Sequence, residues 1–131
     1  MCALFISLEY FFSITETFFN MIKFLVSILV TATVYNAVPG QTDDTPLITA
    51  TGAHISEENA INHCWVAVSR DLEAEGFKMG SKILVEGTGS YDGVWTIQDR
   101  MNKRWRKKID FLVNKDVKLG KWENLKITLV E

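Results

Sequence analysis

The chain has 131 residues, enough for one domain with its own core and too few for two ordinary domains. Its formal net charge is -2 and its pI is near 5.7. This balance gives no reason to expect nucleic acid or an acidic membrane surface as a partner. Any recognition of charge has to be local.

The chain contains two cysteines, Cys2 and Cys64, which are far apart in the sequence. Because Cys2 falls in a segment expected outside the folded domain, we expect no disulfide framework, and Cys64 is predicted to be a small buried apolar side chain. The histidines His54 and His63 have only Cys64 nearby as a further zinc ligand. We therefore expect neither a metal nor another cofactor.

Residues 1–30 form a hydrophobic N-terminal segment, expected to be helical. The part before residue 20 carries Glu9 and Glu16, and a carboxylate near the bilayer centre costs about 2 kcal/mol or more, so this part makes a poor spanning helix. Met21 is a candidate for the true start. The residues after it have the short basic and then apolar regions of a secretory signal.

We therefore expect export to the periplasm, the cell envelope or the medium. No small-x-small cleavage site precedes Thr31, so either cleavage is atypical or the segment stays as a membrane anchor. The alternative is a cytoplasmic protein whose N-terminal segment packs as a core helix.

From Thr31 onward the apolar residues come in short runs rich in β-branched and aromatic side chains, separated by Gly, Asn, Asp and Pro. No stretch keeps a long 3.6-residue period, so the pattern predicts one all-β domain over 31–131. A six-stranded closed barrel suits this length. The expected strands are Thr31–Ala37, Trp65–Ser69, Lys82–Glu86, Val94–Gln98, Ile109–Val113 and Leu125–Val130.

Short helical turns are expected between the strands, at Ser56–Asn62, Leu72–Glu75 and Asn114–Lys118. The glycine-rich segment 87–93 predicts a hairpin turn and matches no phosphate-binding loop. Residues 77–80 and 117–120 are similar, and each group precedes an expected strand. A barrel of two interlocked halves would leave such a repeat.

Three aspartates stand at or beside strand ends, where a barrel presents side chains to a cleft: Asp71, Asp99 and Asp110. Asp110 lies between Ile109 and Phe111. Partial burial beside another carboxylate would raise its pKa and keep it protonated, which is the state of a general acid. Each aspartate alone also fits a turn cap or an ion-pair partner of a neighbouring Arg or Lys, and spacing does not decide between these interpretations.

The sequence around the aspartates resembles the 3D domain family, which is named for its three aspartates. The matching motifs run in order over almost all of 31–131: Tyr35-Asn36-Ala37, Thr49-Ala50-Thr51-Gly52, Ala67-Val68-Ser69-Arg70-Asp71, Asp99-Arg100-Met101-Asn102-Lys103-Arg104 and Ile109-Asp110-Phe111. The resemblance implies a double-psi β-barrel related to the catalytic barrel of membrane-bound lytic transglycosylase A. Thr51 and Arg100 depart from the family, where we expect serine and a small or hydroxyl residue.

The resemblance also implies an activity: a peptidoglycan lytic transglycosylase that cleaves the MurNAc–GlcNAc β-1,4 bond and leaves 1,6-anhydroMurNAc ends. By its place in the motif, Asp110 would be the catalytic acid, with Asp99 and Asp71 shaping its environment. Asp110 would protonate the glycosidic oxygen and its carboxylate would then take the proton of the C6 hydroxyl. The partner is the peptidoglycan glycan strand.

The candidate substrate-binding residues are Tyr35, Thr49, Thr51, Asn102, Lys103 and Arg104. The resemblance places the two threonines in a loop that lines the cleft, while Tyr35 either stacks on a sugar or simply packs. Six Lys and Arg side chains surround Trp105 within 100–108. This run predicts a cationic, sugar-stacking wall for an anionic glycan, or a solvated loop.

A second function remains open. The same barrel could be a non-catalytic glycan-binding module that keeps its aspartates for structure, since the chain lacks the second domain with which larger enzymes of this kind grip a strand. The two hypotheses differ at Asp110, which only the enzyme needs as an acid.

Overall fold

The structure is a computed structural model that describes residues 2, 26–36, 48–56, 59–117 and 119–130. The expected helical character of 3–25 lies outside these ranges. Within them, no helix combines the length and the apolar character needed to span a membrane.

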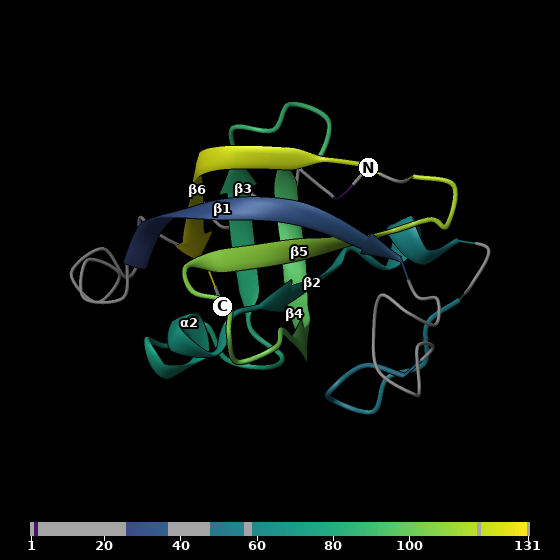
Figure 1. Ribbon diagram of the computed structural model, residues 1–131, viewed down its shortest axis with the longest axis horizontal. Coiled ribbons are helices and arrows are strands. Elements are labelled where there is room, and N and C mark those ends of the chain that lie inside the picture. Colours follow the sequence, from purple (N-terminus) through teal and green to yellow (C-terminus); the bar gives the residue numbers. More distant parts are fainter. Residues whose placement is uncertain (1, 3–25, 37–47, 57–58, 118, 131) are drawn as a thin grey trace, which may run out of the picture.

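Six strands in the described residues close into one barrel (Figure 1). The strands are β1 (Val26–Asn36), β2 (Trp65–Val68), β3 (Lys82–Glu86), β4 (Gly93–Arg100), β5 (Lys108–Val113) and β6 (Lys121–Leu129). Their order around the barrel is β1-β5-β2-β4-β3-β6. The pairs β1–β5 and β2–β4 are parallel, whereas the other four are antiparallel. The predicted all-β, six-stranded closed barrel is confirmed.

The ring of strands is symmetric in its connectivity. Exchanging β1, β2 and β3 for β4, β5 and β6 leaves every pairing and its direction unchanged. The similar groups 77–80 and 117–120 precede β3 and β6, which this exchange relates. The sequence repeat therefore coincides with the two halves of the barrel.

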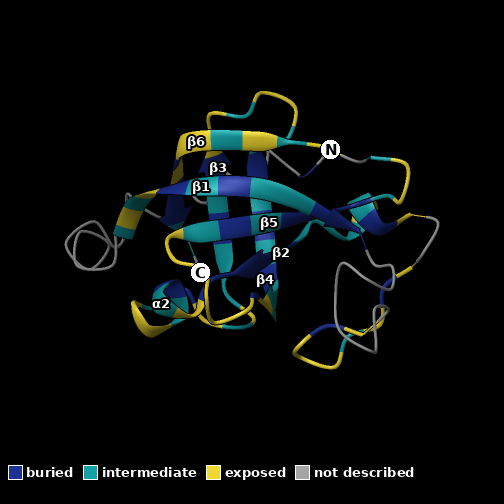
Figure 2. Ribbon diagram, in the orientation of Figure 1, coloured by how far each residue is buried: buried dark blue, intermediate teal, exposed yellow. Residues whose placement is uncertain are grey.

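Side chains fill the inside of the barrel. Successive residues of a strand point to opposite faces, and along β3 and β4 buried residues alternate with half-buried ones (Figure 2). The fully buried apolar residues form the core. Aromatic rings pack at the centre, with the Trp95 and Phe111 centroids 4.6 Å apart and Tyr91 and Trp122 edge to face at 5.3 Å. An interior packed in this way leaves chemistry to the outer face and the ends.

Two short helices occur among the described residues, η1 (Ala60–His63) and α2 (Arg70–Ala74). They confirm the helical turns expected near 56–62 and 72–75, although each is shifted. The turn expected to be helical at 114–118 is different, since over its described residues the chain makes a tight turn in which the Val117 N–H donates to the carbonyl of Asn114 at 3.0 Å. The hairpin at 87–93 is confirmed, and Asp92 Oδ1 accepts the backbone N–H of Gly87 and Thr88.

The first strand begins earlier than expected. β1 starts at Val26, not at Thr31, and Val26–Val30 pair with β6 from Leu129 to Leu125. The first strand of the barrel therefore begins within the segment expected as the leader. A barrel strand of Val, Ile and Leu has the same composition as the apolar region of a secretory signal. The alternation of exposed Leu29 with buried Val30 is too short to distinguish the two from sequence.

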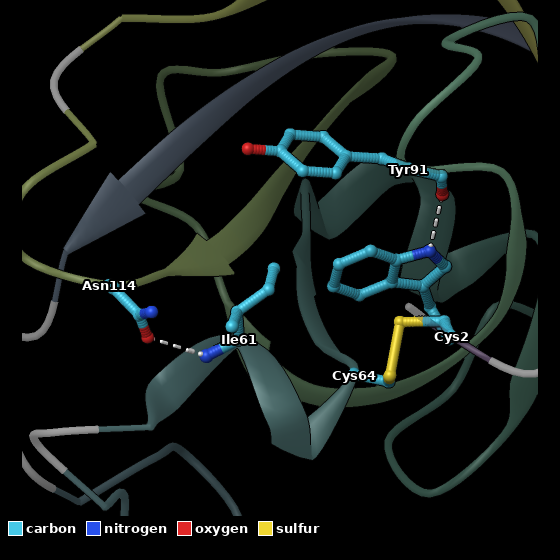
Figure 3. Close-up of a disulfide and its surroundings, with 6 residues drawn as sticks. Cys2, Ile61, Cys64, Tyr91 and Asn114 are labelled. Atoms are coloured by element: carbon cyan, nitrogen blue, oxygen red, sulfur yellow. Dashed lines mark hydrogen bonds between the residues drawn. A yellow bond between two sulfur atoms is a disulfide. The ribbon is translucent and has the colours of Figure 1, made fainter.

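Cys2 belongs to the folded domain and is bonded to Cys64 across a sequence separation of 62 (Figure 3). Three expectations for the cysteines are thus wrong: that there is no disulfide, that Cys2 lies outside the domain, and that Cys64 is a buried apolar side chain, since Cys64 is bonded and half-buried. Cys2 is 3% exposed and its backbone covers Gly93, where a Cβ would come within 2.6 Å of the Cys2 carbonyl oxygen. Gly93 also has φ of +131°, so glycine is required twice over. The sequence contains no spacing rule that pairs two isolated cysteines.

The disulfide should contribute measurably to stability. Replacing Cys64 by Ala opens a loop of this length, which chain entropy alone values at about 4 kcal/mol, so we expect the free energy of unfolding to fall by about 2–4 kcal/mol. Urea unfolding of the oxidised full chain and of Cys64→Ala measures the difference. Dithiothreitol should lower the midpoint of the parent and leave that of the variant unchanged. Equal midpoints for the two oxidised proteins would show that the bond adds nothing.

Candidate functional site

One row of side chains crosses the outer face of five neighbouring strands. Its order is Asp99 on β4, Ala67 on β2, Asp110 on β5, Thr33 on β1 and Lys121 on β6. Each is the direct register partner of the next, and register partners point to the same face. With strands about 4.8 Å apart, the row spans roughly 19 Å. We call it the aspartate row.

An irregularity in β4 places Asp99 in this row. Val66 pairs with Ile97, but the next residue of β2, Ala67, pairs with Asp99, so Gln98 is an extra residue. Without the bulge Asp99 would follow Trp95 and Ile97 to the barrel interior, since these share its parity and are buried there. The bulge re-aims the carboxylate outward.

Asp110 sits at the centre of the row and is partly buried. Burial raises its pKa, while a hydrogen bond donated by the Thr33 hydroxyl and the nearby Lys108 ammonium lower it. The net pKa stays above that of an ordinary aspartate. Small neighbours, Ala67 and Thr33, flank it on both sides. The result is a carboxyl that holds its proton to a higher pH and is not covered by bulky register partners.

Asp99 ties a loop to the barrel. Its Oδ1 accepts the backbone N–H of Ala50 at 3.0 Å and of Arg100 at 2.8 Å, and its Oδ2 accepts the Tyr35 hydroxyl at 3.4 Å. Burial raises the pKa of Tyr35 well above its usual value, and the charges of Asp99 and Asp110 add to that effect. Tyr35 is thus a neutral donor, and the two aspartates lie close enough to act on the same phenol.

Asp71 lies beyond the end of β2, at the start of α2. Its Oδ2 accepts the backbone N–H of Lys107 at 3.0 Å, which fastens the segment before β5. Burial raises the pKa of Asp71, but the hydrogen bonds from the Ser69 hydroxyl and from backbone N–H groups lower it below its usual value. Asp99 and Asp110 therefore flank Ala67. Asp71 lies four residues after Ala67 and supports the segment before β5.

The predicted loop threonines are fixed above the bulge. Thr51 Oγ1 donates to Gln98 Oε1 at 2.5 Å and lies 2.9 Å from Thr49 Oγ1, which accepts the Ala53 N–H. Thr49 is 5% exposed, so it shapes the loop, whereas Thr51 is exposed beside the row. Tyr35 is 7% exposed and packs in a small outer cluster with Ala67 and other apolar residues, which favours packing over sugar stacking.

Some of the cationic side chains in the basic segment 100–108 make contacts within the protein. Arg100 forms a bidentate ion pair with Glu73, with N–O distances of 2.8 and 2.7 Å. The Lys108 ammonium lies 3.7 Å from the ring centroid of Trp105, and the Arg104 guanidinium carbon 4.8 Å. Lys103 and Asn102 are exposed, and Asn102 Oδ1 accepts the Arg104 N–H. Two of the cations, Lys108 and Arg104, therefore lie against the ring of Trp105, in the segment that leads into β5.

Sequence reasoning missed Ala67, Thr33 and Lys121. Thr33 precedes Tyr35 by one strand period and so shares its face, a signal that was present. Lys121 joins the row only through the β1–β6 register, which no local pattern encodes.

Across the part of the chain that the structure describes, no three His, Cys, Asp or Glu side chains gather as metal ligands. Models of known protein families, curated proteins and solved structures were all compared with this chain, and none of them matches.

The hydrogen bond from the Thr33 hydroxyl should lower the pKa of Asp110. Thr33→Val keeps the shape and removes the donor, so we expect the pKa of Asp110 to rise further. Carboxyl carbon chemical shifts followed against pH give the value in each protein. A Thr31→Val variant, on the same strand face, should leave it unchanged. A fall in the pKa in Thr33→Val would contradict the assignment.

Burial of Asp110 should also appear in the pH dependence of stability. Its folded pKa is above the unfolded value of about 3.9, so the folded state binds the proton more tightly. This contribution is complete below the unfolded pKa and is lost as pH rises through the folded pKa. Asp110→Asn, which cannot ionise, should therefore gain stability relative to the parent over that window. Urea midpoints at a series of pH values test this, and a constant difference would refute it.

Proposed function

We propose that this chain is a three-aspartate domain of the double-psi barrel type and a lytic transglycosylase of peptidoglycan, with Asp110 as its acid. One observation carries the proposal: a carboxyl with a raised pKa lies in the middle of an outward-facing row, between two small side chains. A partly buried carboxyl that holds its proton to a higher pH than an ordinary aspartate suits the role of general acid in glycosidic cleavage.

The fold is compatible with this assignment. Two parallel pairs, β1–β5 and β2–β4, are related by the exchange of the two halves. Interlocked halves of this kind support the double-psi description, and the motif resemblance spans both of them. Fold alone does not give function, so the aspartate row has to carry the chemistry.

The proposed reaction needs one proton carrier. Asp110 donates its proton to the glycosidic oxygen as the C1–O bond breaks, and the sugar passes through an oxocarbenium-like state. The resulting carboxylate accepts the proton of the C6 hydroxyl as its oxygen bonds to C1. The leaving sugar keeps the first proton, Asp110 recovers the second, and no water is consumed.

The neighbouring residues act as positioning groups. Asp99 holds the loop of Thr49 and Thr51 through the Ala50 N–H and orients the Tyr35 hydroxyl. Exposed Thr51 and the basic segment with Lys103 and Arg104 offer hydroxyl and cationic contacts to a glycan bearing carboxylates. Asp71 keeps that segment attached to the barrel.

The disulfide supports the proposed location. A bond between Cys2 and Cys64 is typical of proteins that fold in an oxidising compartment such as the periplasm or the medium. Export to the cell envelope, where peptidoglycan lies, agrees with that chemistry. Since β1 begins at Val26, cleavage near residue 30 would remove strand residues that pair with β6.

A glycan-binding module without catalysis is the second candidate. It is favoured by the hydrogen bonds of Asp71 and Asp99. Both carboxylates accept hydrogen bonds from backbone N–H groups and so have a structural role that is independent of any reaction. Under this alternative the aspartate row binds sugar and Asp110 transfers no proton.

Digestion of purified peptidoglycan by the full chain decides between the two. The parent should release anhydromuropeptides, identified by mass, and Asp110→Asn should lower the rate by about 10²- to 10⁴-fold, the usual contribution of a general acid. Asp116→Asn, an exposed carboxyl on the turn after β5, is the matched control and should keep full activity. A parent that binds peptidoglycan and releases nothing would refute the enzyme and favour the binding module.

A further inference from the structure

The first part of β1 is paired with another strand on only one side. β1 begins at Val26, whereas its parallel neighbour β5 begins at Lys108, the register partner of Thr31. Residues 26–30 therefore extend past the start of β5, and among the described residues they pair only with β6 (Figure 1). We call the side of 26–30 that faces away from β6 the β1 edge.

The backbone groups of Ser27 and Leu29 point to the β1 edge. The Thr31 N–H donates to the carbonyl of Lys107 at 3.0 Å, so the backbone groups of Thr31 face β5. Backbone groups alternate from side to side along a strand, so those of Leu29 and Ser27 face the same way, beyond the start of β5. No hydrogen bond between described residues reaches them on that side. Both residues are exposed, Leu29 to 55%.

The turn at Lys107 keeps β5 from covering the β1 edge. Lys107 has φ of +48°, a left-handed conformation that disfavours residues other than glycine and that no strand continues through. Its N–H donates to Asp71 Oδ2 at 3.0 Å, which holds the turn in place. Strand edges are usually protected by charged residues or proline, but residues 26–30 contain neither. The edge is therefore a template on which a further strand can form.

A basic loop adjoins the β1 edge where β5 begins. Residues 103–108 contain five Lys or Arg and no acidic residue, in a chain whose net charge is -2. Arg106 and Lys107 are exposed, and the ion pairs between described residues include neither of them. Because the Lys107 carbonyl is bonded to Thr31, this loop lies directly at the end of the edge. A segment lying along the edge would thus meet positive charge at one of its ends.

We propose that the β1 edge binds an extended segment of a partner protein by β-strand addition, with acidic side chains of that segment at Arg106 and Lys107. The added strand occupies the place beside Ser27 and Leu29 that β5 leaves open. Its backbone bonds to these two residues, an apolar side chain packs on exposed Leu29, and the acidic residues provide selectivity. The aspartate row crosses β1 at Thr33, so this interaction does not depend on the proposed reaction.

Amide hydrogen exchange of the oxidised full chain tests whether the edge is open. In dilute protein the N–H groups of Ser27 and Leu29 should exchange fast, whereas those of Ile28 and Val30, which face β6, should exchange slowly. Slow exchange at Ser27 and Leu29 in dilute protein would show that the edge is already covered and would overturn the proposal. Protection that appears only at high protein concentration would overturn it in favour of a second copy of the chain at the edge.

A displayed library of short random peptides, selected on the oxidised full chain, tests the chemistry of the partner. The selected peptides should combine alternating apolar residues with acidic residues toward one end. Adding such a peptide in synthetic form should slow exchange at Ser27 and Leu29. Selection of no peptide, or of peptides without acidic residues, would contradict the proposal.

Two variants test the backbone and the charge separately, with the selected peptide as the probe in isothermal titration. Leu29→Pro removes an N–H at the edge and leaves the bonds to β6, since proline is tolerated where the N–H of an edge strand faces solvent. It should abolish binding. Arg106→Glu replaces attraction by repulsion and should weaken binding about tenfold. Lys115→Glu, at an exposed lysine beyond the other end of β5, is the matched control and should bind like the parent.

Full binding by both Leu29→Pro and Arg106→Glu would overturn the proposal, as would equal loss in Arg106→Glu and Lys115→Glu. Circular dichroism shows whether Leu29→Pro is folded. If it is not, the comparison of Arg106→Glu with Lys115→Glu decides, because both positions are exposed and outside the core.

Discussion

Closure of the barrel is the constraint on which the rest of this structure depends. A ring of six strands is narrow enough for its own side chains to fill, and here Trp95, Phe111 and Trp122 fill it with packed aromatic rings. Because this interior is packed, chemistry is left to the outer face and the ends of the barrel. On that face the register aligns Asp99, Ala67, Asp110, Thr33 and Lys121, five residues from five strands.

The bulge at Gln98 links this architecture to chemistry. It turns Asp99 from the inward parity of Trp95 and Ile97 to the outward face, where it fixes the Ala50 loop and the Tyr35 hydroxyl. Asp110 needs no bulge, because the regular alternation of β5 already points it outward between buried Ile109 and Phe111. Burial raises the pKa of the Asp110 carboxyl, while the hydrogen bond from the Thr33 hydroxyl limits the rise. The strands that form the barrel wall therefore also set the pKa of Asp110.

Much of the fold could be predicted from local patterns, and much of the site could not. Short β-branched runs such as Ile83–Val85 and Ile109–Val113 predict strands, and the Gly-rich segment 87–93 predicts a hairpin. Each of these patterns is complete within a few residues, so it can be recognised without knowing the fold. Three features depend on partners distant in sequence: the start of β1 at Val26, the Cys2–Cys64 bond and the place of Lys121 beside Thr33. The aspartates were found through a motif resemblance, yet the separation of Asp71 from the other two emerged only from the register.

The fate of water in the reaction tests the central claim most directly. In the proposed mechanism the C6 hydroxyl closes onto C1 and Asp110 only moves protons, so no solvent oxygen enters the product. Digestion of peptidoglycan by the full chain in isotope-labelled water should therefore yield anhydromuramyl ends that carry no label. Labelled reducing ends would show hydrolysis and contradict the account, as would an unchanged rate of release in Asp110→Asn.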